Sequence, residues 1–181
     1  MATSFYFAYG SNMLSARLRA RCPSAVFRTT AMVRDHVVAF GKPSVDASGK
    51  AALLPTTGKI AYGVVFEIAS EELEALDEVE GPGYRREEAF PVVCTRSGET
   101  IHTCLYLANE HDDRLKPYDW YLALMLAGIA EHGLGNDYAS VFRAVGWQHD
   151  HQLERGSRRE ALSALEHAGI ADYRLVFSQV Q

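Results

Sequence analysis

The sequence predicts an α+β protein in which a curved or closed β-sheet is packed against helices. Segments with strand character lie mostly before residue 108, and the longest helical patterns come after them. The chain also lacks the regular alternation of strands and helices that is typical of a parallel sheet. Its length of 181 residues fits one domain, so we expect a single domain spanning residues 1–181.

The chain opens with a strand, a tight loop and a helix. Residues 4–9 are apolar or aromatic on both faces, which is typical of a buried strand. Gly10-Ser11-Asn12 breaks the strand, and residues 13–21 have a helical pattern with Ser11 or Asn12 available as the N-cap. Backbone N–H groups and a helix dipole pointing the same way can hold a carboxylate or an oxyanion. The alternative is that Gly10 only makes a turn and Asn12 only caps the helix.

The middle of the chain is rich in strand and turn signals. Strands are predicted at residues 25–31, 35–40, 51–54, 60–68, 84–95 and 99–107, the last two joined by Arg96-Ser97-Gly98. The polar segment 41–50 is predicted to be a mobile loop. One helix interrupts the strands: we expect Ser70 to cap it and Gly81-Pro82-Gly83 to come directly after its end near Val79.

The remaining chain is mainly helical by its periodicity. Helices are predicted at residues 118–132, 136–145 and 158–167, and a last strand at 171–177. Gly133 would end the longest helix. Residues 149–156 form the one linker-like stretch, and the segment after it is too short for a domain of its own. The segment 146–181 is therefore expected to pack on the rest of the molecule.

Composition argues against several classes of partner. The net charge is −5 and no basic run is long enough to track a phosphate backbone, so no nucleic acid is expected. No segment approaches the roughly 20 apolar residues of a membrane span, and the N-terminus lacks the pattern of a signal peptide. Three widely spaced cysteines, Cys22, Cys94 and Cys104, indicate reduced thiols and a cytoplasmic protein. His149 and His151 lack a third metal ligand nearby and fit a surface loop better.

The acidic segment 71–80 contains one carboxylate that differs from the others. At roughly 100° per residue, Glu80 comes within about 20° of Leu73 and about 40° of Leu76, so it would face the core. Burial and repulsion from Asp77 and Glu78 would favour its protonated form, which suits a general acid or base near pH 7. The alternative is a helix that frays at Val79 and leaves Glu80 exposed.

Common catalytic motifs are missing from the sequence. There is no Gly-x-Ser-x-Gly elbow, no phosphate-binding loop and no dinucleotide fingerprint. An enzyme of this sequence would therefore need no metal and no cofactor, and would rely on one carboxylate and a backbone-lined pocket.

Three motifs together resemble the γ-glutamyl cyclotransferase family. They are Tyr6-Phe7-Ala8-Tyr9-Gly10-Ser11-Asn12, then Leu76-Asp77-Glu78-Val79-Glu80-Gly81, then Tyr121 with Gly128 and Glu131-His132-Gly133-Leu134 after it. The resemblance spans about residues 5–145. It implies a closed, mostly antiparallel β-barrel with surrounding helices, and the conversion of a γ-glutamyl amide into 5-oxoproline and a free amine.

The resemblance also implies roles for particular residues. The family's catalytic glutamate, which precedes the glycine of the second motif, is Glu80 here. The substrate loop of the family matches residues 6–12 and so assigns substrate binding to Tyr6, Tyr9, Gly10, Ser11 and Asn12. The pocket tyrosines of the family match Tyr84 and Tyr121. The partner would be a small γ-glutamyl compound, and a homodimer is compatible with this interpretation.

Two further hypotheses stay open at this stage. The same barrel would serve as a binding module if it held an acidic ligand without turning it over. A hydrolase using Ser11 or Cys104 is the other alternative. The Gly-Ser-Asn form of the first motif points away from the glutathione-specific branch of the family, but the sequence does not define the leaving amine.

Overall fold

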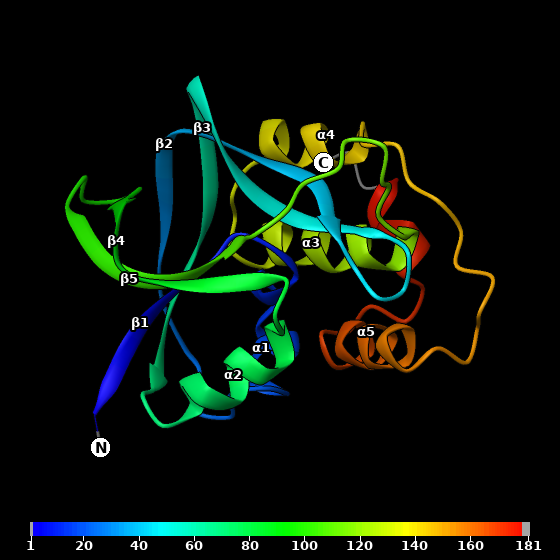
Figure 1. Ribbon diagram of the computed structural model, residues 1–181, viewed down its shortest axis with the longest axis horizontal. Helices are drawn as coiled ribbons and strands as arrows, with labels where there is room; N and C mark the ends of the chain where they lie inside the picture. The colour runs from blue at the N-terminus through cyan, green and yellow to red at the C-terminus, as the bar shows by residue number, and fades with distance from the viewer. Residues whose placement is uncertain (1, 179–181) are drawn as a thin grey trace.

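A closed β-barrel forms the centre of the computed structural model, which describes residues 2–178 (Figure 1). The strands are β1 (Thr3–Ala8), β2 (Val26–Pro43), β3 (Gly49–Ala69), β4 (Tyr84–Cys94) and β5 (Thr100–Ala108). Their order around the barrel is β1-β3-β2-β4-β5. All neighbours are antiparallel except β1 and β5, which close the barrel in parallel where Tyr6 pairs with Cys104. The predicted closed, mostly antiparallel barrel is confirmed.

Strands β2 and β3 are each longer than the sequence pattern indicates. The pattern predicts two strands in the region of each, but the structure has one continuous strand in both places. Their pairing shifts register between Phe27 and Thr29, between Arg34 and His36, and between Phe40 and Lys42. Such bulges bend a strand without ending it, which lets a long strand adopt the curvature of a barrel. Residues 32–34, at the predicted break in β2, pair regularly with β3, and residues 56–59, at the predicted break in β3, form an irregularity opposite Asp35 and not a turn between two strands.

The segment predicted as a mobile loop is a short, well-anchored turn, so that prediction was wrong. Only residues 44–48 lie between β2 and β3, and Asp46 and Ser48 are buried. Asp46 accepts hydrogen bonds from Ser48 Oγ at 2.6 Å and from Lys50 Nζ at 2.7 Å. Buried polar groups need such partners, and here they are supplied by the turn and by the first residues of β3.

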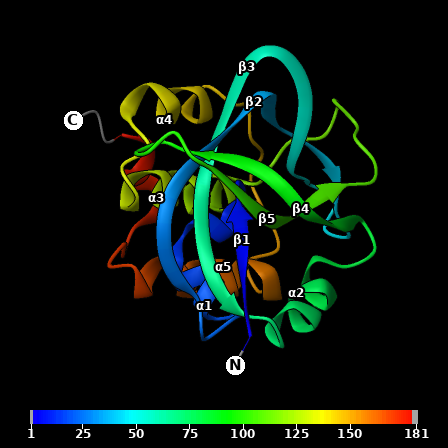
Figure 2. The same cartoon turned by 90° about the vertical axis from the view of Figure 1, so that its left-hand side faces the viewer.

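Helices pack around the barrel, with the strands in front of α3 and α5 in Figure 2. They are α1 (Ser15–Arg19), α2 (Glu72–Glu80), α3 (Asp119–Glu131), α4 (Asn136–Arg143) and α5 (Gly156–His167), with 3-10 turns at Ser11–Met13 and Tyr173–Phe177. Both predicted caps were wrong. Leu14 precedes α1 and Glu71 precedes α2, neither with a side-chain cap, and Ser70 Oγ instead contacts Ser4 Oγ at 2.9 Å. Among residues 2–178, no helix is long and apolar enough to cross a membrane.

Helix α3 lies in the core and fixes the position of the loop after β1. Trp120, Leu122, Leu124 and Met125 have at most 1% of their surface exposed. Gly128 allows close approach, because a Cβ there would lie 2.7 Å from both Leu14 N and Met13 Cβ. A larger residue would push the 3-10 turn Ser11–Met13 away from α3.

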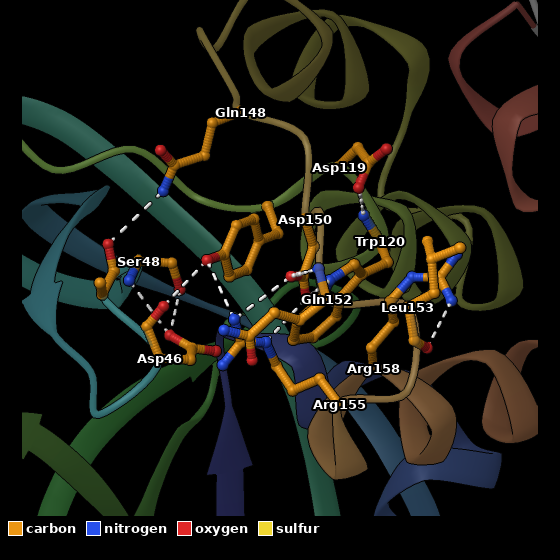
Figure 3. A network of polar contacts seen from close by, with 12 residues as sticks. Asp46, Ser48, Asp119, Trp120, Gln148, Asp150, Gln152, Leu153, Arg155 and Arg158 are labelled. Atoms are coloured by element: carbon orange, nitrogen blue, oxygen red, sulfur yellow. Dashed lines mark hydrogen bonds and ion pairs between the residues drawn. The ribbon is translucent and has the colours of Figure 1, made fainter.

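The C-terminal segment is held against α3 by polar contacts (Figure 3). Asp150, in the stretch interpreted as a linker, is buried and accepts from Trp120 Nε1 at 3.1 Å and from Arg155 Nε at 2.8 Å. The predicted strand at 171–177 was wrong, because Tyr173–Phe177 is a 3-10 turn. Its residue Val176 is buried in the core, while Leu175 is exposed.

Candidate active site

A narrow cavity of about 30 Å³ lies beside the end of β1. Its wall combines the loop after β1, the end of α2, the start of β4, and single residues of β3, β5 and α3. The lining residues are Tyr6, Tyr9, Gly10, Ser11, Asn12, Ala51, Glu80, Tyr84, Tyr106 and Tyr121. The structure therefore brings together all eight residues that the sequence suggests for a site, and adds Ala51 and Tyr106.

Among the described residues that line the cavity, Glu80 is the only one with a carboxylate. It is the last residue of α2, and the helix does not fray at Val79. Leu73 and Leu76 are buried on the same face, and 15% of the Glu80 side chain is exposed. Gly81 comes next with a φ of 68°, a left-handed conformation that suits glycine and turns the chain away directly after the carboxylate.

The carboxylate of Glu80 is held through one oxygen. Its Oε1 accepts from Asn12 Nδ2 at 3.0 Å and from Arg21 Nη1 at 3.1 Å. The same Arg21 nitrogen donates to Asn12 Oδ1 at 2.9 Å, and Asn12 Nδ2 also donates to Tyr6 Oη at 2.9 Å. Asn12 is thus a pocket residue that orients a carboxylate, and it caps no helix.

The sequence predicts that Asp77 and Glu78 repel the carboxylate of Glu80, but neither side chain is its neighbour in the site. Asp77 is engaged elsewhere, with Arg86 Nη1 at 2.5 Å and Tyr106 Oη at 2.7 Å, and Glu78 is exposed. The charge nearest to Glu80 is the guanidinium of Arg21. The expectation of a like-charged neighbourhood was therefore wrong, because α2 directs its other acids outward or toward Arg86.

Two tyrosines of the cavity wall hold the backbone of Ala51 by its N–H and C=O groups. Tyr84 Oη donates to the carbonyl of Ala51 at 2.7 Å, and the N–H of Ala51 donates to Tyr121 Oη at 3.2 Å. Tyr9 Oη donates to the carbonyl of Tyr106. Burial raises the pKa of Tyr6, Tyr84 and Tyr121 above the ordinary tyrosine value, so their hydroxyl groups stay protonated at neutral pH.

Lys42 places a second cation at the edge of the site. Its Nζ lies 4.6 Å from the centre of the Tyr84 ring. Burial lowers its pKa, and the negative charge of Glu80 partly counteracts that shift. A half-buried ammonium over an aromatic face favours the approach of an anionic ligand.

Sequence reasoning missed Arg21, Ala51 and Tyr106. A signal for Arg21 existed: it lies three residues after Leu18 and seven after Leu14, which places it on the same face of a helix. Tyr106 lies two residues after Cys104 and so points to the same side of β5. Ala51 offered no signal, because the pocket uses its backbone.

The geometry disfavours the two hydrolase nucleophiles. His132, the histidine near the loop, contacts Ser15 Oγ at 3.3 Å and the Met13 carbonyl at 3.0 Å, and not Ser11. Burial raises the pKa of Cys104 to about 12, which keeps its thiol protonated and weakly nucleophilic. Within the described part of the chain, no three His, Cys, Asp or Glu side chains converge as a metal site would require.

Comparisons with known proteins agree with this geometry. A family model described as "Gamma-glutamyl cyclotransferase, AIG2-like" matches residues 6–122. Proteins named "Gamma-glutamylcyclotransferase" from Bos taurus and Homo sapiens are each 32% identical over 146 residues, which cover 77% of this chain and 77% of each relative. A solved structure titled "Gamma-glutamyl cyclotransferase" superposes with a TM-score of 0.80 and 27% identity, covering 90% of this chain and 99% of the other. On these grounds the chain belongs to the γ-glutamyl cyclotransferase, AIG2-like family.

Proposed function

We propose that this chain converts a γ-glutamyl amide into 5-oxoproline and a free amine, with Glu80 as general acid and base. Membership in the family assigns the class of enzyme. The observation that carries the assignment of Glu80 is its position as the one carboxylate among the described lining residues, held by Asn12 and Arg21 beside the loop after β1.

The substrate supplies its own nucleophile in this reaction. Its α-amine attacks its γ-carbonyl, forming the ring bond, and the bond to the leaving amine then breaks. Tethering of the two groups removes the entropy of encounter, which contributes about 7–11 kcal/mol in the best-oriented cases. The protein then has to transfer protons: Glu80 takes one from the α-ammonium group, which frees the lone pair for attack, and returns it to the leaving amine. The attacking nitrogen loses a second proton when it becomes the lactam N–H, and this proton passes to solvent or to the released amine, which leaves as an ammonium ion.

The remaining pocket groups bind and orient the substrate. Backbone N–H groups around Gly10 and Ser11 hold either the α-carboxylate or the oxyanion of the tetrahedral intermediate. Tyr84 and Tyr121 give aromatic walls with hydroxyl groups at their ends.

The cellular setting is part of the same proposal. We place the protein in the cytoplasm, as a single domain in which residues 146–178 pack on the barrel and its helices; residues 179–181 of the predicted C-terminal segment lie outside the described residues. The three cysteines, Cys22, Cys94 and Cys104, are all free and buried, which fits a reducing compartment. A homodimer is the oligomeric state to test, by light scattering during size-exclusion chromatography.

The variant Glu80→Gln tests the catalytic assignment. It keeps the shape of the side chain but removes the proton acceptor, so we expect a fold of parental stability and a loss of turnover on the order of 100- to 10,000-fold. Release of 5-oxoproline from γ-glutamyl-alanine measures the effect. The exposed Glu78 on the same helix gives the control Glu78→Gln, which should retain parental turnover. Parental turnover by Glu80→Gln would refute the role assigned to Glu80.

The same substrate separates the enzyme from the binding-module hypothesis. A binding module would be stabilised by γ-glutamyl-alanine in a thermal-shift experiment and would release no 5-oxoproline. We expect release of product in amounts that far exceed the amount of protein.

A further inference from the structure

We propose that Arg21 is a positioning residue for Glu80: it fixes the oxygen Oε1, so that Oε2 is the oxygen that exchanges protons with the substrate. The inference rests on the proposed role of Glu80 as the general acid and base. It concerns a residue that lies outside the three family-like motifs.

The hydrogen bonds of Glu80 are unequally divided between its two oxygens. Both protein donors, Arg21 Nη1 at 3.1 Å and Asn12 Nδ2 at 3.0 Å, reach Oε1. No hydrogen bond to Oε2 is found within residues 2–178. An oxygen with two donors has less capacity for a further proton, whereas the other oxygen keeps its lone pairs available. The carboxylate is thus anchored on one side and accessible on the other.

Arg21 is itself held in place. Only 16% of its side chain is exposed, and the nitrogen that contacts Glu80 also donates to Asn12 Oδ1 at 2.9 Å. Its backbone N–H bonds the carbonyl of Leu18 at 2.9 Å, directly after α1. The guanidinium therefore connects the end of α1 to the end of α2. A planar, fixed donor of this kind limits rotation of the carboxylate that it binds.

The ion pair also offsets the cost of placing a carboxylate in a largely buried site. The negative charge of Glu80 also acts to raise the pKa of several other groups, namely Tyr6, Tyr9, Arg17, Cys22, Lys42, Tyr84 and Tyr121. Burial raises the pKa of the tyrosines and of Cys22, so these groups are neutral near pH 7. In the described structure, Arg21 is the cation within ion-pair distance of Glu80, whereas Arg17 pairs with Glu160.

The test uses Arg21→Gln and Arg21→Lys in the full chain, with γ-glutamyl-alanine as substrate. Loss of the cation disfavours the carboxylate form, so the acidic limb of the kcat/KM profile should move to higher pH by about one to two units in Arg21→Gln. The charge alone is restored in Arg21→Lys, which should recover part of the shift. Arg19→Gln removes an exposed arginine of α1 that contacts the Ala25 carbonyl, and its profile should match that of the parent.

A second readout does not require activity. In protein labelled with ¹³C at glutamate carboxyl carbons, the signal assigned to position 80 by its loss in Glu80→Gln should titrate at higher pH in Arg21→Gln than in the parent. An unshifted limb and an unshifted titration in a folded Arg21→Gln protein would overturn the role of Arg21. A parent protein without cyclotransferase activity would instead refute the proposed function, whatever the titration shows.

Discussion

At the scale of single residues, Asn12 holds several groups of the site together, whereas its place in the sequence also allowed a simple role as a helix cap. Its amide group contacts Tyr6, Arg21 and Glu80, all within 3.0 Å. A side chain with one donor end and one acceptor end fits this position, because it must donate to a carboxylate and accept from a guanidinium. Asn12 therefore ties the loop after β1 to the acid at the end of α2.

The variant Asn12→Asp keeps the size of this side chain and replaces its donor with an acceptor. Loss of the donor leaves two carboxylates facing each other in a buried site, so we expect kcat/KM to fall by about 10- to 100-fold. Steady-state kinetics with γ-glutamyl-alanine measures the loss. Asn109→Asp is the control, because Asn109 is exposed and its side chain bonds the Pro82 carbonyl, away from the cavity lining. Equal losses in both variants would contradict the contribution of Asn12 to the site.

At the scale of elements, the packing of α3 against the turn Ser11–Met13 fixes the position of the loop that lines the pocket. Gly128 makes this contact possible, since any larger residue meets Leu14 and Met13. Tyr121, about two helical turns closer to the start of α3, reaches Ala51 in the pocket wall. One helix thus positions both the loop and a wall of the cavity.

The substitution Gly128→Ala should therefore be costly although alanine favours helices. Its Cβ would lie 2.7 Å from two atoms of the turn, and overpacking of this kind costs about 1–3 kcal/mol. Urea unfolding monitored by circular dichroism measures the change. Gly156→Ala, at the start of α5 where nothing lies within 4 Å, should leave the free energy of unfolding nearly unchanged. An unchanged free energy of unfolding in Gly128→Ala would mean that α3 and the turn can move apart at little energetic cost.

The sequence predicts the helices and strands better than it predicts their caps, bulges and connections. The period of 3.6 residues places Glu80 on the side of Leu73 and Leu76, and the structure agrees. Caps at Ser11, Asn12 and Ser70 failed because these side chains have tertiary partners or lie apart from the helix start, which local preference does not encode. The irregularity of β3 was missed for a related reason, since the polar residues 56–59 within a strand have the same pattern as a turn.

At the scale of the whole molecule, two buried aspartates connect distant segments. Tyr118 links Asp46, in the turn between β2 and β3, to the surroundings of Asp150: its Oη donates to the Asp46 carbonyl at 2.9 Å and accepts from Arg155 Nη2 at 3.5 Å. Arg155 in turn pairs with Asp150, and both aspartates are labelled in Figure 3. Burial opposes the ionisation of each carboxyl group, but Lys50 and Arg155, together with their hydrogen bonds, hold both pKa values below the ordinary range. These aspartates therefore tie the C-terminal segment and the turn to the core in their charged forms.

Acid should destabilise the fold through this pair. A pKa lower in the folded than in the unfolded chain gives stability that is complete above the unfolded value of about 4 and is lost as the pH falls through the folded value. Urea unfolding at about pH 6 and about pH 3 should show a loss that is smaller in Asp46→Asn than in the parent. Glu110→Gln changes an exposed carboxylate and should leave the parental loss intact. An identical loss in all three proteins would exclude Asp46 as a source of acid sensitivity.

The parallel closure of the barrel has a further consequence for opening motions. Strands β1 and β5 are joined at Tyr6 and Cys104, whereas β2 and β3 pair along most of their length. A seam paired at so few residues separates at low cost, and Tyr6 and Tyr106 of the cavity stand on its two sides. Breathing of the seam would widen the pocket for an incoming substrate, and a bound ligand would slow hydrogen–deuterium exchange at these two strands first.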